Sequence, residues 1–187
     1  MLKVEDVFAD LPILETKRLL LRKMMLEDQE DVFEYASDPL VTAHTIWDFH
    51  RSIDDSIRFI EFMLEKYAKK EPSNWAIVNK DNNKMIGTCG FVYWAPEHSR
   101  AEIGYALARP YWSQGLITEA AEKVVEFAFS AMKLNRLEAR CNVDNTGSER
   151  VMQKLGMQFE GIIREQLFMK GEFKNIKLYS LLKNERG

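Results

Sequence analysis

Cysteine, histidine, proline and glycine are all scarce in this chain of 187 residues. There are only two cysteines, Cys89 and Cys141, and three histidines, and neither cysteine has a CxxC partner. We therefore expect neither a disulfide framework nor a zinc module, and we predict no metal site. Both cysteines fall in apolar strand-like runs, which favours buried, reduced thiols that are poor nucleophiles.

The chain also lacks a basic excess and any long apolar run. Lys and Arg number 26 against 29 Asp and Glu, a formal net charge of -3, so nucleic acid is not an expected partner. No apolar stretch approaches the ~20 residues of a membrane span. Glu5, Asp6 and Asp10 are unlike the start of a signal peptide. We therefore expect a cytoplasmic protein without a membrane partner.

What is present is ordinary for a folded domain. Hydrophobic residues make up 46% and charged residues 29% of the chain, which excludes a disordered protein. The sequence contains no repeat, low-complexity tract or Pro/Gly-rich linker. We therefore expect one domain over residues 1–187.

Apolar periodicity predicts an α/β (α+β) chain. Helical spacing covers 27–37, 52–69, 118–132 and 146–155, and residues 40–51 are expected to be irregular. Strand patterns cover 16–24, 75–78, 84–94, 101–107, 136–143, 159–169 and 176–182. This order predicts a mixed sheet that is antiparallel at first and then crosses over through helices.

Local signals support several of these boundaries. Asp38-Pro39 ends the first helix, because the residue before proline avoids helical geometry. Ser52 and Asp55 form a capping-box-like start. Gly156 suits a left-handed helix cap. Alternation over 136–143 predicts a half-buried strand with Glu138 on its polar side.

The most informative segment is 105–120, YALARPYWSQGLITEA. A strand leads through a Pro-containing loop to Gly115, three residues before the predicted helix start at Thr118. Main-chain N–H groups at such a loop and helix N-terminus suit a phosphate or pyrophosphate. Neither GxxxxGK[ST] nor GxGxxG is present. A plain turn before a helix is the other interpretation, and the residues alone leave both open.

Four segments together resemble a known family: EIGYAL, PYWSQGLITEA, NVDNTGSERVMQKLGM and GEFKNIKLYSLL. The second is similar to motif A of GNAT N-acetyltransferases, [QR]xxGx[GA], which wraps the acetyl-CoA pyrophosphate. Together they resemble the ribosomal-protein-alanine (RimJ/RimL type) branch over roughly 16–182. The resemblance implies the GNAT fold, a mixed central sheet with helices on both faces. It also implies acetyl transfer from acetyl-CoA to a primary amine.

The resemblance also implies which residues bind the cofactor. Leu107 would pair its main chain with the pantetheine amide, and residues 113–118 would hold the pyrophosphate. Trp112 takes the Gln/Arg position of motif A, and Ile117 departs from the usual Gly or Ala. The implied cofactor-binding residues are Leu107, Trp112, Ser113, Gln114, Gly115, Leu116, Ile117, Thr118, Asn145 and Lys154.

Asn145 and Ser148 stand at the start of the last predicted helix. Asn and Ser are common helix caps, which is one explanation of both residues. The resemblance implies instead that Asn145 contacts pantetheine and that Ser148 protonates the departing thiolate. Lys154 and Arg150 could neutralise outer phosphates, and a solvated helix face explains them equally well.

Glu102 is the predicted general base. Aminolysis of a thioester needs a neutral amine, although an α-amine has a pKa of ~8 and a lysine ~10.4. A carboxylate that takes the proton, directly or through water, therefore helps, and the resemblance implies Glu102 for this role. The alternative is a structural ion pair with Arg100 or Arg140. A main-chain N–H near Tyr105 or Ala106 is expected to polarise the thioester oxygen.

The acceptor is left open between a protein N-terminal amine, such as that of a ribosomal protein, and a small amine. We expect its selectivity to lie in residues 40–51, the first helices and residues 93–100, because loops on a rigid scaffold often carry specificity. A homodimer is also compatible with the resemblance. Asn175 stands where the branch has Asp, which puts a substrate-binding role there in doubt. A catalytically silent acyl-CoA-binding sensor or interaction module is the alternative function.

Overall fold

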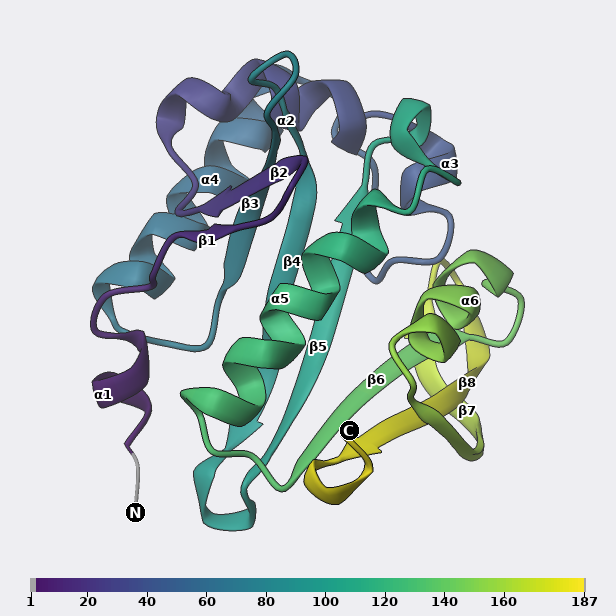
Figure 1. Ribbon diagram of the computed structural model, residues 1–187. Coiled ribbons are helices and arrows are strands. Elements are labelled where there is room, and N and C mark those ends of the chain that lie inside the picture. The colour runs from purple at the N-terminus through teal and green to yellow at the C-terminus, as the bar shows by residue number, and fades with distance from the viewer. Residues whose placement is uncertain (1–2, 187) are drawn as a thin grey trace.

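The computed structural model describes residues 3–186 and contains an eight-stranded sheet with helices on both faces (Figure 1). The strands are β1 (Leu14–Glu15), β2 (Leu19–Arg22), β3 (Asn74–Asn79), β4 (Met85–Ala95), β5 (Arg100–Leu107), β6 (Arg136–Asn142), β7 (Gln158–Met169) and β8 (Glu172–Leu182). The helices are α1 (Val4–Phe8), α2 (Gln29–Ala36), α3 (Pro39–Thr42), α4 (Ile53–Ala68), α5 (Leu116–Ser130) and α6 (Thr146–Lys154).

The strand order across the sheet is β1-β2-β3-β4-β5-β6-β8-β7. Every neighbouring pair is antiparallel except β5 and β6, which are parallel. Parallel neighbours need a long crossover, and α5 provides it. The predicted mixed sheet, antiparallel first and then crossing over through a helix, is confirmed.

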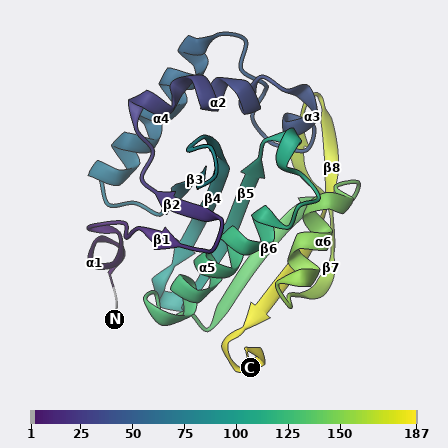
Figure 2. The ribbon, with the colours of Figure 1, turned by 45° about the horizontal axis from the view of Figure 1, so that its top comes forward.

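Helices cover both faces of the sheet. Figure 2 shows α2 and α4 on one side of the strands and α5 on the other. Apolar residues of β5, such as Ala101 and Ile103, pack into the cluster that includes α5. The intervening side chains of β5 therefore point to the opposite face. None of the helices in the described part of the chain is both long and apolar enough to cross a membrane.

Aromatic rings form the centre of the core beneath α5. Phe91 lies 6.1 Å from both Phe8 and Trp75, measured between ring centroids, and 6.2 Å from Phe127. The Trp75 indole also donates a 2.7 Å hydrogen bond to the Pro12 carbonyl. Elsewhere in the strands, the two cysteines are free and buried, as predicted.

Several local predictions are confirmed. Helix α4 begins directly after Ser52, whose main-chain N–H donates to the Asp55 carboxylate at 3.1 Å. Gly156 follows α6 with a φ of +77°, the left-handed cap that its position predicts. The Lys170-Gly171 turn joins β7 to β8 as expected.

Other boundaries differ from the sequence prediction. Helix α5 begins at Leu116 rather than Thr118, because Leu116 is buried and Gly115 is the residue directly before the helix. Helix α2 ends at Ala36, before Asp38-Pro39, and Pro39 opens the next helix, α3, which extends into the stretch expected to be irregular. Strand β8 begins at Glu172, earlier than expected. The short elements α1 and β1 were not predicted.

Glu138, like Asn142, is an exception to the predicted alternation, because both polar residues are buried. The pattern over 136–143 places Glu138 on a solvated face, but in the structure this residue is only 4% exposed. The neighbouring strands β5 and β8 and several arginine side chains surround it. The sequence pattern cannot show this cover, because it comes from partners distant along the chain.

The aromatic cluster predicts a large cost for removing Phe91. Phe91→Ala should lower the free energy of unfolding by about 3–5 kcal/mol, because the ring leaves a cavity among packed neighbours. Val92→Ala is the matched control, since Val92 is 60% exposed on the same strand. Urea unfolding measures both. Equal losses would contradict this view of the core.

Candidate active site

A cavity of about 650 Å³ opens beside the carboxyl end of β5. The parallel pairing of β5 with β6 stops at Ile103 and Ala139, so the two strands separate beyond that point. Residues of α3, β5, α5 and α6 form the walls. Those from the predicted site are Leu107, Trp112, Ser113, Gly115, Leu116, Ile117, Thr118, Asn145, Ser148 and Lys154.

The main chain of β5 offers polar groups to this cavity. Ala108 donates its N–H to Ile86 on β4 at 2.7 Å. Successive residues of a strand direct their main-chain groups to opposite edges. Tyr105 and Leu107 therefore direct theirs to the edge that faces β6, where pairing has ended. The Leu107 carbonyl accepts a 2.7 Å hydrogen bond from the Trp112 indole.

The N-terminus of α5 forms one end of the cavity. Gly115 precedes the helix with a φ of +75°, and Ser113 has a φ of +60°. A Cβ added at Gly115 would meet only the Arg18 guanidinium, at 3.7 Å. The first N–H groups of a helix have no partner within it and favour anions. This end therefore fits a phosphate group.

An ion pair from Arg18, directly before β2, holds the start of α5 in place. The Arg18 Nε donates to Glu119 of α5 at 2.7 Å, and Thr16 donates its hydroxyl to the same carboxylate at 2.6 Å. Arg18 also donates from Nη1 to the Gln114 carbonyl at 3.0 Å. Burial raises the pKa of Glu119, but these hydrogen bonds outweigh it and hold the pKa below its usual value. Sequence reasoning missed this contact, because it joins residues about a hundred positions apart.

Two of the residues that the resemblance implies for cofactor binding, Gln114 and Ile117, are not simply cavity-lining residues. Gln114 does not line the cavity, and its side-chain amide donates to the Pro110 carbonyl at 2.8 Å. Ile117 lines the cavity, but it also packs partly against the apolar core. Its branched side chain is therefore shared between the cavity wall and the core.

Asn145 and Ser148 lie together at the start of α6. The Asn145 side-chain carbonyl accepts the Ser148 N–H at 3.0 Å, so the helix-capping interpretation holds for Asn145. The Tyr105 hydroxyl lies 3.0 Å from the Ser148 hydroxyl and also donates to the Ser148 main-chain carbonyl at 3.0 Å. Burial raises the pKa of Tyr105, which keeps its hydroxyl protonated. Sequence reasoning did not identify Tyr105 as a side-chain partner.

Lys154 and Arg150 also line the cavity, from α6. Neither forms an ion pair with an acidic residue within the described residues. Their positive charge is therefore available to an anionic ligand in the cavity.

Glu102 lies outside the cavity, on the sheet face away from α5. Its side chain is 16% exposed, and the nearest arginine, Arg140, is 3.5 Å away. Burial raises the pKa of Glu102, Arg140 lowers it, and Glu138 raises it, with a net increase. A carboxylate with a raised pKa is a better proton acceptor near neutral pH.

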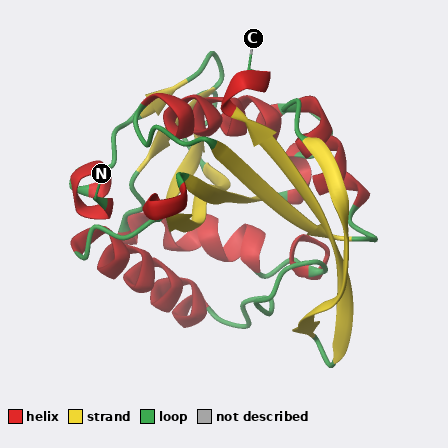
Figure 3. Cartoon of the chain, turned by 90° about the horizontal axis from the view of Figure 1, so that it is seen from below, coloured by secondary structure: helices red, strands yellow, loops and turns green. Residues whose placement is uncertain are grey.

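The tip of the β7–β8 hairpin contacts α3, one of the helices whose residues line the cavity. Figure 3 shows this hairpin extending beyond the rest of the sheet, and its tip residue Lys170 donates to the Thr42 carbonyl of α3. Asn175 has a structural role within the hairpin. Its side-chain carbonyl accepts the Glu165 N–H at 2.8 Å, where β7 bulges.

A family model described as an acetyltransferase (GNAT) domain matches residues 18–158. The chain belongs to the GNAT acetyltransferase family. The uncharacterized N-acetyltransferase YoaA of Bacillus subtilis (strain 168) is 37% identical over 172 residues, 92% of this chain and 97% of YoaA. The chain is therefore an acetyl-CoA-dependent N-acyltransferase, as predicted.

Solved structures agree with this fold. A GNAT-family acetyltransferase from Bacillus anthracis matches with a TM-score of 0.82 at 29% identity, covering 92% of this chain and 99% of that one. RimL, a ribosomal L7/L12 α-N-protein acetyltransferase solved with coenzyme A, matches with a TM-score of 0.80 at 17% identity. That match covers 91% of this chain and 98% of RimL. Within residues 3–186, no cluster of three or more His, Cys, Asp or Glu side chains is placed to hold a metal.

The left-handed backbone at Ser113 predicts a stabilising substitution. A non-glycine residue in this region costs about 1–2 kcal/mol, whereas the extra freedom of glycine in the unfolded chain costs about 0.4–1 kcal/mol. Ser113→Gly should therefore raise the free energy of unfolding by about 0.5–1 kcal/mol in denaturant titrations. A loss of stability would show that the Ser113 side chain contributes more than its backbone strain costs.

Proposed function

We propose that this enzyme transfers the acetyl group of acetyl-CoA to a primary amine, either a protein N-terminal amine, such as that of a ribosomal protein, or a small amine. One observation carries the proposal: a single cavity extends from the N-terminus of α5 to the Tyr105–Ser148 hydroxyl pair. Retention of Glu102 and Ser148 favours catalysis over a silent acyl-CoA-binding module.

The residues around the cavity fit acetyl-CoA as a substrate. The N–H groups that begin α5, around Gly115, would hold the pyrophosphate. Arg150 and Lys154 would neutralise the outer phosphates. Because the Leu107 carbonyl already accepts from Trp112, the Leu107 N–H is the main-chain group that would bind the pantetheine carbonyl.

The proposed reaction is direct attack of the amine on the thioester. Glu102 accepts the amine proton, directly or through water, and the acceptor approaches from the sheet face that carries Glu102. The Tyr105 N–H polarises the thioester oxygen, because the Ala106 N–H is directed to β4 instead. Ser148 protonates the departing thiolate, and its hydroxyl lies within hydrogen-bond distance of Tyr105.

Gly115 tests the cofactor end of the cavity. Gly115→Trp should weaken acetyl-CoA binding at least about 100-fold from a low-micromolar affinity, roughly -8 kcal/mol, because the indole would fill the phosphate end. Gly156→Trp is the matched control, since Gly156 has a φ of +77° and open space around it. Titration calorimetry measures both. Unchanged affinity in Gly115→Trp would overturn the phosphate assignment.

Glu102 tests the chemistry. Glu102→Gln should lower kcat by about 10²- to 10⁴-fold, because the amide cannot accept the proton. Acetyl-CoA affinity should stay nearly unchanged, since Glu102 lies outside the cavity. Released thiol is measured with a panel of N-terminal peptides and small amines as acceptors. Strongly weakened acetyl-CoA binding would show that Glu102 is structural and that the base assignment is wrong.

A further inference from the structure

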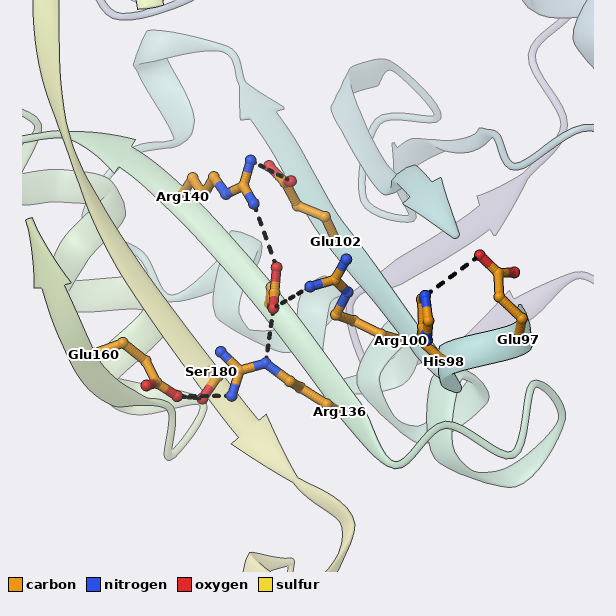
Figure 4. A network of polar contacts seen from close by, with 9 residues as sticks. Glu97, His98, Arg100, Glu102, Arg136, Arg140, Glu160 and Ser180 are labelled. Carbon is orange, nitrogen blue, oxygen red and sulfur yellow. Dashed lines mark hydrogen bonds and ion pairs between the residues drawn. The ribbon is translucent and has the colours of Figure 1, made fainter. Parts of the chain in front are cut away.

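Three arginines that Figure 4 labels, Arg100, Arg136 and Arg140, surround the carboxylate of the buried Glu138, on the sheet face that carries Glu102. Arg136 donates from Nε to Glu138 at 2.7 Å. The Arg100 Nη1 lies 3.6 Å from the same carboxylate, and the Arg140 Nη2 lies 3.4 Å from it. A buried charge is costly unless it is paired, which explains why several arginines gather here.

Arg140 is shared between two carboxylates. Its Nη2 lies 3.4 Å from Glu138, and its Nη1 lies 3.5 Å from Glu102. Both distances exceed the roughly 2.7–2.9 Å of a close charge-assisted hydrogen bond. Glu102 and Glu138 are direct neighbours in the parallel pairing of β5 and β6. The Arg140 guanidinium therefore interacts with both carboxylates and forms a close ion pair with neither.

The other two arginines are held away from Glu102. Arg136 forms a second 2.7 Å ion pair with Glu160 of β7, which also accepts a hydrogen bond from the Ser180 hydroxyl. Arg100, on the strand of Glu102, lies 5.9 Å from the centre of the Tyr93 ring.

The neighbouring elements therefore leave Glu102 with few close charges. On β4 the residue paired with Glu102 is Tyr93, and on β6 its charged neighbours are Glu138 and Arg140. These two act in opposite directions, since Arg140 favours the ionised form of Glu102 and Glu138 disfavours it.

We propose that Glu138 and Arg140 are positioning residues, in which Glu138 draws Arg140 away from Glu102 so that the Glu102 carboxylate remains an effective proton acceptor. The inference rests on the proposed role of Glu102 as the base. A carboxylate gripped by an arginine alone would be a weaker base, because the pair stabilises its ionised form. Complete removal of Arg140 would leave Glu102 beside another buried carboxylate. When Glu102 and Glu138 share Arg140, the proton affinity of Glu102 lies between these two extremes.

Two substitutions should move the titration of Glu102 in opposite directions. Glu138→Gln removes the repulsive charge and releases Arg140 to Glu102, so the Glu102 midpoint should fall by about one pH unit. Arg140→Gln removes the attractive charge, so the midpoint should rise by about one pH unit. Arg140→Lys retains the charge and should restore part of the wild-type value.

Carbon NMR of protein labelled at the glutamate carboxyl carbon measures these midpoints without any acceptor. The Glu102 signal is identified by its absence from Glu102→Gln. The same variants then give pH profiles of kcat/KM with one active amine from the panel, so that the ionisation of the amine is common to all. The acid limb of these profiles should move with the NMR midpoint.

Asp28→Asn is the matched control. Asp28 is also a buried carboxylate paired with an arginine, at 2.7 Å, but this pair lies elsewhere in the molecule, with Arg22 on β2 and Asp28 directly before α2. Asp28→Asn should lower the free energy of unfolding and leave the Glu102 midpoint unchanged. If Glu138→Gln does not fold, Arg140→Gln carries the test, because the Arg140 side chain is 36% exposed.

Opposite shifts from the two variants support the inference. Shifts in the same direction, or no shift in folded variants, would overturn it. A Glu102→Gln enzyme that keeps full turnover would instead overturn the proposed base, whatever the titrations give. The NMR and kinetic measurements thus separate a failure of the network from a failure of the proposed function.

Discussion

The active-site architecture depends on the short pairing between β5 and β6. Only Arg100 to Ile103 of β5 pair with β6, although β4 pairs with β5 as far as Leu107. Beyond Ile103 one edge of β5 therefore faces the cavity instead of a neighbouring strand. Because β5 and β6 are parallel, their carboxyl ends lie at the same edge of the sheet. The loops that leave these ends bring the N-termini of α5 and α6 to the two sides of the cavity.

This separation also divides the proposed chemistry between two faces of the sheet. Leu107 and the start of α5 belong to the face covered by α5, whereas Glu102 points to the opposite face. Gly104 lies between these regions, and a Cβ added there would come within 2.6 Å of the Val92 side chain. The Val92 side chain of β4 therefore occupies the space over Gly104, and a larger residue at 104 would require Val92 to move. A gap between strands can connect the two faces where a continuous sheet would separate them.

Features that depend on residues close together in the sequence could be predicted, and features that depend on distant partners could not. The capping box at Ser52, the cap at Gly156 and the crossover into α5 follow from residues close together in the chain. The Arg18–Glu119 ion pair joins two distant segments, so no local pattern indicates it. The start of α5 was misplaced by two residues, because burial of Leu116, rather than its sequence neighbours, fixes the boundary.

The burial of Glu138 also could not be predicted from the local sequence, and it raises the question of whether this buried carboxylate stabilises the fold. Its strand pattern predicts exposure, yet the carboxylate is buried among arginines. A buried ion pair is weak evidence for stability, since well-packed apolar residues of similar volume often stabilise a fold as well or better. Stability alone therefore does not explain a carboxylate at this position. Its position beside Glu102 gives a functional reason, because an apolar side chain at 138 would leave Arg140 free to pair with Glu102 alone.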